Sequence, residues 1–233
     1  MRMRRKPWAR PELDACPFYV KEPTEYYGKW QTFFPKSQPI HLELGCGKGV
    51  FLAQLAVNHP EVNYIGVDIK SEVLACTRRN LADAYAAAGR SVDNVAILSQ
   101  DIERIFMMLS PEDVVDRIYI NFCNPWPTAS RHKKRLTHFK QLALYQKFLR
   151  PGGGNSPWGE IWFKTDDDAL FQDSLTYFAR SGFSVRYLTW DLYNSGFQGS
   201  LPTEHEQMFV RENIPIKFCI AAAPPVECGS TDE

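Results

Sequence analysis

Several features that would place this sequence in a special class of protein are missing. Its six cysteines form no C-x-x-C pair and lie near no histidine cluster at zinc-ligand spacing, which predicts structural thiols and no metal site. No apolar run is long enough to cross a bilayer, and no secretion-signal core follows the basic start, which predicts a cytoplasmic protein without a membrane partner. Lysine plus arginine and aspartate plus glutamate both number 27, so any polyanion would bind local patches.

What is present is typical of one folded domain. The chain has 233 residues, of which 44% are hydrophobic and 23% charged, and no internal repeats. Residues 1–39 are rich in proline, tyrosine and phenylalanine without a sustained period and predict an N-terminal arm laid over a core. Residues 40–222 then form the main domain, and residues 223–233 are an acidic tail. The first ten residues carry five cations and no acid, a second candidate contact for phosphates.

Strand-like and helix-like segments alternate along the main domain. The predicted strands are residues 40–45, 62–68, 94–101, 115–122, 159–166, 183–192 and 215–223. The predicted helices are residues 50–60, 71–89 with a serine N-cap, 102–110, 136–153, 168–182 and a short one near 203–212. This alternation predicts an α/β fold whose mostly parallel sheet is covered by helices on both faces.

Polar residues and a glycine fall where the predicted strands end. In such sheets, ligands bind beyond the carboxyl ends of the strands. The residues at this rim are Glu43, Gly45, Asp68, Asp101, Asn124 and Asp166.

The segment "ELGCGKG" places three glycines between the first strand and the first helix. A P-loop would need serine or threonine after Lys48, and a dinucleotide fingerprint would need glycine where Val50 stands, so both patterns fail. The spacing G-x-G-x-G, with Asp68 ending the next strand, is typical of class I S-adenosylmethionine binders. The alternative is an ordinary glycine turn flanked by solvated acids.

The chemistry of this cofactor suits acidic residues. Its ammonium group, ribose hydroxyls and adenine amino group all donate hydrogen bonds, and a carboxylate only accepts them. We therefore expect Asp68 at the ribose, Asp101 at the adenine and Glu43 near the methionine end.

The segment "NFCNPWPTASRHKKRL" follows the fourth predicted strand. Its two prolines exclude a helix or a central strand and predict a rigid loop. The segment ends in a basic run, Arg131 to Arg135, of the kind that binds phosphates without reading the nucleotide sequence. A solvated basic face is the alternative, but the position beside the catalytic rim favours nucleic acid.

The chain as a whole resembles the bacterial tRNA (guanine-N7-)-methyltransferases over about residues 40 to 222. The motifs that carry the resemblance are "HLELGCGKGVFL", "IGVDIKSEVL", "RIYINFCNPWP", "HKKRLTH", "LRPGG", "IWFKTDDDALFQDSL", "SGF" and "TEHEQMF". The resemblance implies a class I, Rossmann-like methyltransferase fold with seven strands, the last antiparallel. It implies methyl transfer from S-adenosyl-L-methionine to N7 of guanine 46 in the variable loop of tRNA, by a monomer or homodimer.

The resemblance also assigns roles to individual residues. Asn124 and Asp166 are the implied catalytic residues. The implied cofactor contacts are Glu43, Gly45, Gly47, Gly49, Asp68, Asp101 and Asn124. The implied guanine or tRNA contacts are Thr128, Arg131, Lys133, Lys134, Asp166, Thr203, Glu204 and Glu206. No metal ligand is implied.

The sequence departs from the family pattern at several positions. Many members have aspartate at Asn124, lysine at Thr128 and tyrosine at His205, and residues 152–159 contain an insertion in which we expect Trp158 to pack on its own loop. Because N7 of guanine carries a lone pair and no proton, the reaction needs no general base, and we expect Asn124 to be compatible with activity. Two alternatives stay open: a non-catalytic RNA-binding protein with this fold, and an enzyme that methylates exocyclic amino groups.

Overall fold

The computed structural model describes residues 6–153 and 158–225, and in this part of the chain seven strands form one sheet. Their order is β3-β2-β1-β4-β5-β7-β6. The strands are β1 (Ile40–Leu44), β2 (Asn63–Asp68), β3 (Val95–Ser99), β4 (Val115–Asn121), β5 (Glu160–Thr165), β6 (Ser184–Thr189) and β7 (Lys217–Ala222). Strands β1 to β5 are paired in parallel, whereas β7 is antiparallel to both of its neighbours. The predicted fold class, including the antiparallel last strand, is confirmed.

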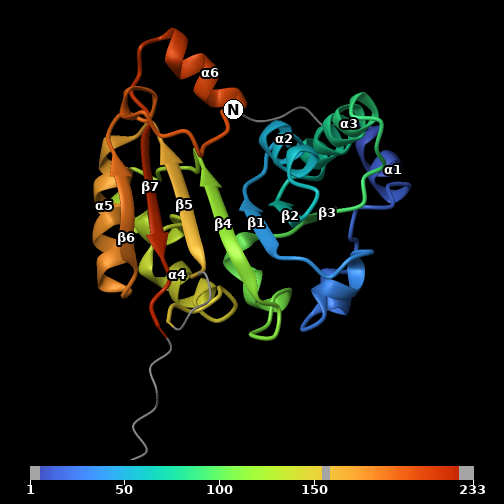
Figure 1. The fold of residues 1–233 in the computed structure, drawn as a ribbon, viewed down its shortest axis with the longest axis horizontal. Helices are drawn as coiled ribbons and strands as arrows, with labels where there is room; N and C mark the ends of the chain where they lie inside the picture. Colours follow the sequence, from blue (N-terminus) through green and yellow to red (C-terminus); the bar gives the residue numbers. More distant parts are fainter. Residues whose placement is uncertain (1–5, 154–157, 226–233) are drawn as a thin grey trace, which may run out of the picture.

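Helices cover the sheet on both faces. The α-helices are α1 (Ala9–Asp14), α2 (Val50–Asn58), α3 (Ser71–Ala87), α4 (Phe139–Tyr145), α5 (Asp168–Arg180) and α6 (Glu204–Arg211). Short 3-10 helices are η1 (Pro23–Tyr26), η2 (Trp30–Phe33), η3 (Ile102–Met107), η4 (Ala129–Lys134) and η5 (Tyr193–Ser195). Figure 1 shows α1, α2 and α3 gathered beside the β1-β2-β3 half of the sheet, α4 and α5 behind the other half, and α6 above the strand ends. Among the described helices, none is long and apolar enough to cross a bilayer.

The described part of the N-terminal arm belongs to the hydrophobic core. Trp30 is fully buried, and its indole Nε1 donates a hydrogen bond to the Met108 carbonyl at 2.6 Å. Leu13 is equally buried in the cluster around α2 and α3. The arm also extends the sheet locally, because Val20 N donates to Ile97 O at 2.9 Å. The basic residues 1–5, residues 154–157 of the insertion and residues 226–233 of the tail lie outside the described residues.

Two helix predictions need correction. Ser71 is the first residue of α3 and not its N-cap, which is Lys70 without a side-chain cap. The helix expected over residues 136–153 spans only Phe139–Tyr145. It ends early because Leu149 forms a parallel bridge with Val115, and this pairing draws the chain back to the sheet.

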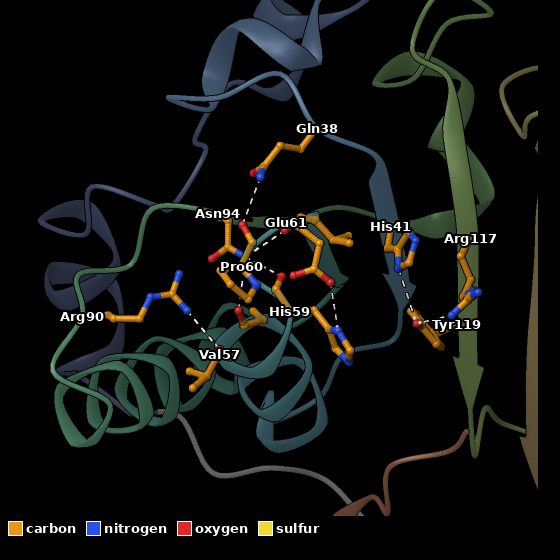
Figure 2. A network of polar contacts seen from close by, with 12 residues as sticks. Gln38, His41, Val57, His59, Pro60, Glu61, Arg90, Asn94, Arg117 and Tyr119 are labelled. Atoms are coloured by element: carbon orange, nitrogen blue, oxygen red, sulfur yellow. Dashed lines mark hydrogen bonds and ion pairs between the residues drawn. The ribbon is translucent and has the colours of Figure 1, made fainter. Parts of the chain in front are cut away.

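The end of the sheet opposite the strands' carboxyl termini is tied by polar contacts (Figure 2). Gln38 donates to the carbonyl of Pro60 at 3.1 Å, and Arg90 donates to that of Val57 at 3.0 Å. The buried Asn94 amide donates to the Val62 carbonyl at 2.8 Å. These bonds satisfy carbonyl groups at and after the end of α2, which otherwise would have no partner. These contacts therefore stabilise the scaffold at this end of the sheet.

Candidate active site

The glycine loop turns tightly between β1 and α2. Gly45, Gly47 and Gly49 have φ of +79°, +54° and +71°, a left-handed region that favours glycine. A Cβ at Gly49 would also lie 2.2 Å from the Thr77 methyl group, so no other residue fits there without movement. The loop is anchored where Gly45 N and Cys46 N both donate to the Val67 carbonyl, at 2.8 and 3.0 Å.

A cavity of about 420 Å³ opens beside this loop. It brings together six residues that the sequence assigned to the site, namely Glu43, Gly45, Gly47, Gly49, Thr203 and Glu204. It is also lined by residues that received no role, among them Lys48, Lys70, Asn121 and Phe122. The cavity therefore lies between the glycine loop and the start of α6.

Glu43 is the most perturbed acid of the site. Its side chain is buried, with Oε1 accepting a hydrogen bond from Asn121 Nδ2 at 3.3 Å and Oε2 buried without a protein partner. Burial raises the pKa of Glu43 to about 8, opposed by the Asn121 bond and increased by the nearby Asp68. Glu43 lines the cavity, and a cationic donor placed there would bond its unpartnered oxygen and favour the ionised form of this acid.

The other two predicted cofactor acids lie at neighbouring strand ends. Asp68 ends β2, and its carboxylate accepts from Gly47 N at 3.1 Å and from Lys70 N at 2.9 Å. Asp101 follows β3 and caps η3 by accepting from Glu103 N at 3.0 Å. Asp68 is thus joined directly to the glycine loop. Neither is among the residues that line the 420 Å³ cavity.

The proline loop after β4 has a constrained backbone. Phe122 and Trp126 are non-glycine residues with φ of +50° and +43°. Asn124, which is exposed, stabilises the turn because its Oδ1 accepts from Trp126 N at 3.0 Å. Strained residues of this kind persist where the surrounding structure holds them, and they concentrate at functional sites.

The basic run after the proline loop divides into two groups. Arg131, Lys133 and Lys134 are exposed around η4, as a phosphate-binding group requires, and Thr128 precedes them, also exposed. Arg135 ends the same cationic run in the sequence, but its side chain is only 2% exposed. It points inward because the chain leaves η4 here and the guanidinium finds partners in the Pro125 carbonyl, the Asp173 carboxylate and His132 Nε2, the last at 3.0 Å.

Those acceptors make Arg135 a support of the loop. Its Nε donates to the Pro125 carbonyl at 2.7 Å and its Nη1 to the Asp173 carboxylate of α5 at 2.5 Å. A planar guanidinium can bridge two acceptors in this way, whereas an ammonium cannot do so with the same geometry.

We expect Arg135→Lys to destabilise the protein by about 1–3 kcal/mol, because the Pro125 carbonyl or Asp173 loses its partner. Urea unfolding of the purified variant measures this. The matched control is Lys133→Met, which removes an exposed cation from the same run and should stay within about 0.5 kcal/mol of the parent. Equal stability of Arg135→Lys and the parent would contradict the supporting role.

The residues predicted from the "TEHE" segment take different positions. Thr203 is buried as the N-cap of α6, where its side chain accepts from Glu206 N and the Glu206 carboxylate accepts from Thr203 N at 2.6 Å. Glu206 is also buried and ion-paired with Lys164 at 3.0 Å. Glu204 is exposed and pairs with Lys48 of the glycine loop at 2.7 Å. Of the three, only Glu204 presents an accessible carboxylate; the side chain of His205 lies outside the described part.

Asp166 and Asp167 occupy different positions after β5. Asp166 directly follows β5 at the rim, and Asp167 caps α5 by accepting from Leu170 N at 2.6 Å. Trp158 packs closely against Gly152 of its own loop, because a Cβ added at Gly152 would lie only 2.6 Å from the Trp158 ring. On β6, the guanidinium of Arg186 lies over the same ring, 4.4 Å from its centroid.

Sequence reasoning missed three polar residues of the site. Asn121 contacts Glu43, Lys48 contacts Glu204, and Lys164 contacts Glu206. A signal existed for Lys164, since a lysine inside the apolar strand "IWFKT" must find a buried partner. Within the described residues, no group of three or more His, Cys, Asp or Glu is arranged to hold a metal ion.

Comparisons with known proteins agree on one family. A family model described as "Putative methyltransferase" matches residues 37–219. A tRNA (guanine-N(7)-)-methyltransferase of Ruminiclostridium cellulolyticum is 55% identical over 222 residues, covering 95% of this chain and 92% of the relative. The same-named protein of Clostridium beijerinckii is 54% identical over 221 residues, covering 95% and 98%.

Solved structures share the fold at low identity. The 16S rRNA methyltransferase KamB has a TM-score of 0.60 and 14% identity, covering 84% of this chain and 93% of its own. A variant of the 16S rRNA (adenine(1408)-N(1))-methyltransferase of Catenulisporales acidiphilia, solved with its cosubstrate SAM, has a TM-score of 0.53 and 17% identity, with 88% and 92% covered.

Proposed function

Since the chain belongs to the family of tRNA (guanine-N(7)-)-methyltransferases, we propose that it transfers a methyl group from S-adenosyl-L-methionine to N7 of guanine 46 in the variable loop of tRNA. The observation that carries the proposal is the cavity between the glycine loop and α6, which is lined by Glu43, a residue whose Oε2 is buried without a partner. We keep the cytoplasm as the predicted location.

The cavity residues fit this cofactor. Gly45 and Gly47 leave room that a side chain would fill, since a Cβ at Gly45 would meet nothing within 4 Å and one at Gly47 only a backbone oxygen at 3.9 Å. Glu43 offers an acceptor to the cationic methionine end. The carboxylate of Asp68 accepts from Gly47 N of the glycine loop at 3.1 Å and is suited to the ribose diol. Asp101, beyond β3, is the acceptor assigned to the adenine edge. When bound, S-adenosyl-L-methionine supplies an electrophilic methyl group.

The protein's part in the reaction is to position its substrates. N7 of guanine has a free lone pair, so no residue has to remove a proton before attack. Orientation alone supplies about 7–11 kcal/mol towards such a reaction. Asn124 holds the proline loop through its bond to Trp126 N, a task that an amide oxygen performs without a charge. For this reason we expect the protein to be an active enzyme although Asn124 stands where many family members have aspartate.

The acids on the substrate side suit guanine. Asp166 at the end of β5 and Glu204 at the start of α6 are the accessible carboxylates among the residues assigned to tRNA. Guanine presents N1–H and its amino group as adjacent donors, which carboxylates accept. Methylated N7 makes the purine positive, and nearby anions stabilise that developing charge. We assign Thr203 and Glu206 to the same substrate surface because their capping box forms the first turn of α6, which carries Glu204.

We expect the exposed cations near the proline loop to bind tRNA phosphates. In the double variant Lys133→Gln/Lys134→Gln, the plot of log affinity against log salt should become shallower by about 1 to 2, because each lost contact removes about 0.7 to 0.9 from the slope. Cofactor affinity should not change. Filter binding between low and physiological salt measures the slope.

The control for this experiment is Lys147→Gln, which removes an exposed cation next to the end of α4. Its slope should equal that of the parent. A double variant with an unchanged slope would show that the phosphates are bound elsewhere.

The function itself is tested by mass spectrometry of nucleosides from unmodified tRNA incubated with the protein and S-adenosyl-L-methionine. A transcript without the variable-loop guanine is the control. We expect 7-methylguanosine in the first and none in the second. Methylated adenosine or cytidine would support an exocyclic-amino methyltransferase instead, and no methylated nucleoside from protein that binds tRNA would support a non-catalytic binder.

A further inference from the structure

A row of polar side chains, buried except for the half-buried Asn121, crosses the sheet beneath the cofactor cavity. It begins at Glu43 on β1 and continues through Asn121 on β4, whose register partner on β5 is Lys164. It ends at Glu206 on α6, which pairs with Lys164. Glu43, Lys164 and Glu206 are each less than 5% exposed. The row therefore joins the sheet under the cavity to a helix that lies above the strand ends (Figure 1).

Lys164 is the member that binds the helix to the sheet. Its ammonium group donates to Glu206 Oε2 at 3.0 Å, to Glu206 Oε1 at 3.2 Å and to the Leu201 carbonyl at 2.8 Å. An ammonium group has three donors, so these acceptors satisfy all of them. A buried lysine is tolerated only with partners of this kind, and removing one member of such a pair leaves the other charge unpaired.

The contact reaches the substrate side through one helical turn. Glu206 accepts from Thr203 N at 2.6 Å while Thr203 caps α6, so Lys164 and the capping box share the same carboxylate. Thr203 and Glu204 of that turn line the cofactor cavity, and Glu204 reaches back to Lys48 at 2.7 Å. One turn of helix is thus held by the sheet on one side and the glycine loop on the other.

We propose that Lys164 is a positioning residue that fixes the first turn of α6 between the two substrates and thereby couples cofactor binding to tRNA binding. This inference rests on the proposed function, because it takes α6 to be part of the tRNA surface. Lys164 itself touches neither substrate. Its effect passes through Glu206 to the backbone of Thr203 and the carboxylate of Glu204.

The test is the double variant Lys164→Met/Glu206→Gln. It removes the ion pair without leaving a buried charge, and glutamine keeps an oxygen that can accept from Thr203 N. We measure the dissociation constant of unmodified tRNA with and without saturating S-adenosylhomocysteine, which does not react. In the parent, we expect the cofactor product to tighten tRNA binding at least about fivefold, the lower end of typical coupling. In the double variant this factor should fall to between about 1 and 2.

The matched control is Arg150→Met/Asp116→Asn, which removes an ion pair of 2.5 Å beside the other end of the sheet. It should lower stability and keep the parent's coupling factor. If the double variant does not fold, the single variant Lys164→Arg, which keeps a positive charge beside Glu206 but changes the geometry of the contacts to Glu206 and Leu201, should show an intermediate factor. With the cofactor product bound, amide hydrogen exchange of residues 204–211 should be faster in the Lys164 variants than in the parent and in the control.

The outcomes separate this inference from the proposed function. A parent that methylates tRNA but shows no coupling, or a double variant with the parent's coupling, would overturn the role of Lys164 and leave the function intact. A parent that neither binds nor methylates tRNA would overturn both.

Discussion

Glu43→Gln is expected to raise the stability of the cofactor-free protein at pH 8 and to weaken cofactor binding. The loss of a charge-assisted hydrogen bond costs about 1.5–3 kcal/mol, which weakens affinity roughly 10- to 150-fold. The gain in stability of the cofactor-free protein arises because Glu43 Oε2 is buried without a partner in the protein. A neutral amide avoids the penalty of burying that charge.

The pH range of the effect follows from the raised pKa. With a pKa of about 8 against an ordinary 4.5, folded Glu43 keeps a proton that the unfolded chain has lost. The folded state then binds more protons, so stability falls as pH rises through this range. Partly buried His41 acts in the opposite sense below pH 6.5, because desolvation lowers its pKa to about 3. The contribution of Glu43 is therefore separable between pH 6.5 and 8.

Thermal or urea unfolding of both proteins across that range measures the difference. The parent should lose about 2 kcal/mol relative to Glu43→Gln between pH 6.5 and 8, at about 1.36 kcal/mol per pH unit. Calorimetry of S-adenosyl-L-methionine binding at pH 8 measures the affinity. Parallel stability curves, or a variant that binds the cofactor as tightly as the parent, would contradict the placement of this acid.

Gly49→Ala is expected to destabilise the protein by about 2–5 kcal/mol. The left-handed backbone costs an L-residue about 1–2 kcal/mol, and overpacking costs about 1–3 more. The overpacking arises because the added methyl group would lie 2.2 Å from Thr77. Thr77 has little freedom to move, since its hydroxyl donates to the Gly47 carbonyl at 2.6 Å.

Two other glycines serve as matched controls. Gly89, at the end of α3, has φ of +67° with nothing within 4 Å of an added Cβ, so Gly89→Ala measures the backbone cost alone. Gly45 has φ of +79° and equally free space, but it lines the cofactor cavity. Gly45→Ala should match Gly89→Ala in urea unfolding and lose cofactor affinity, whereas Gly89→Ala keeps it. A Gly49→Ala protein no less stable than Gly89→Ala would contradict the close approach to Thr77.

Much of the rim of the site follows from the sequence because strand ends are local features. The alternation of strands and helices places Glu43, Asp68, Asp101 and Asp166 at one edge of a parallel sheet without knowledge of any contact. The glycine loop is equally local. Its glycine spacing predicts the tight turn that the structure shows between β1 and α2.

What the sequence did not reveal depends on residues far apart in the chain. Arg135 looks like part of a cationic run until Asp173, 38 residues away, draws it inward. The Lys164 and Glu206 pair joins residues 42 apart, and neither residue type indicates its partner. The length of α4 was overestimated because the helical pattern continues past the point where Leu149 pairs with β4.

The most direct test of the account is the single-turnover rate of methyl transfer, with tRNA and S-adenosyl-L-methionine both saturating, for the natural chain beside Asn124→Asp. A charged hydrogen bond exceeds a neutral one by about 1 kcal/mol, which corresponds to about fivefold in rate. We therefore expect 7-methylguanosine from the natural chain and a rate for Asn124→Asp within about tenfold of it. A natural chain without detectable transfer, restored to normal turnover by Asn124→Asp, would contradict the claim that positioning suffices.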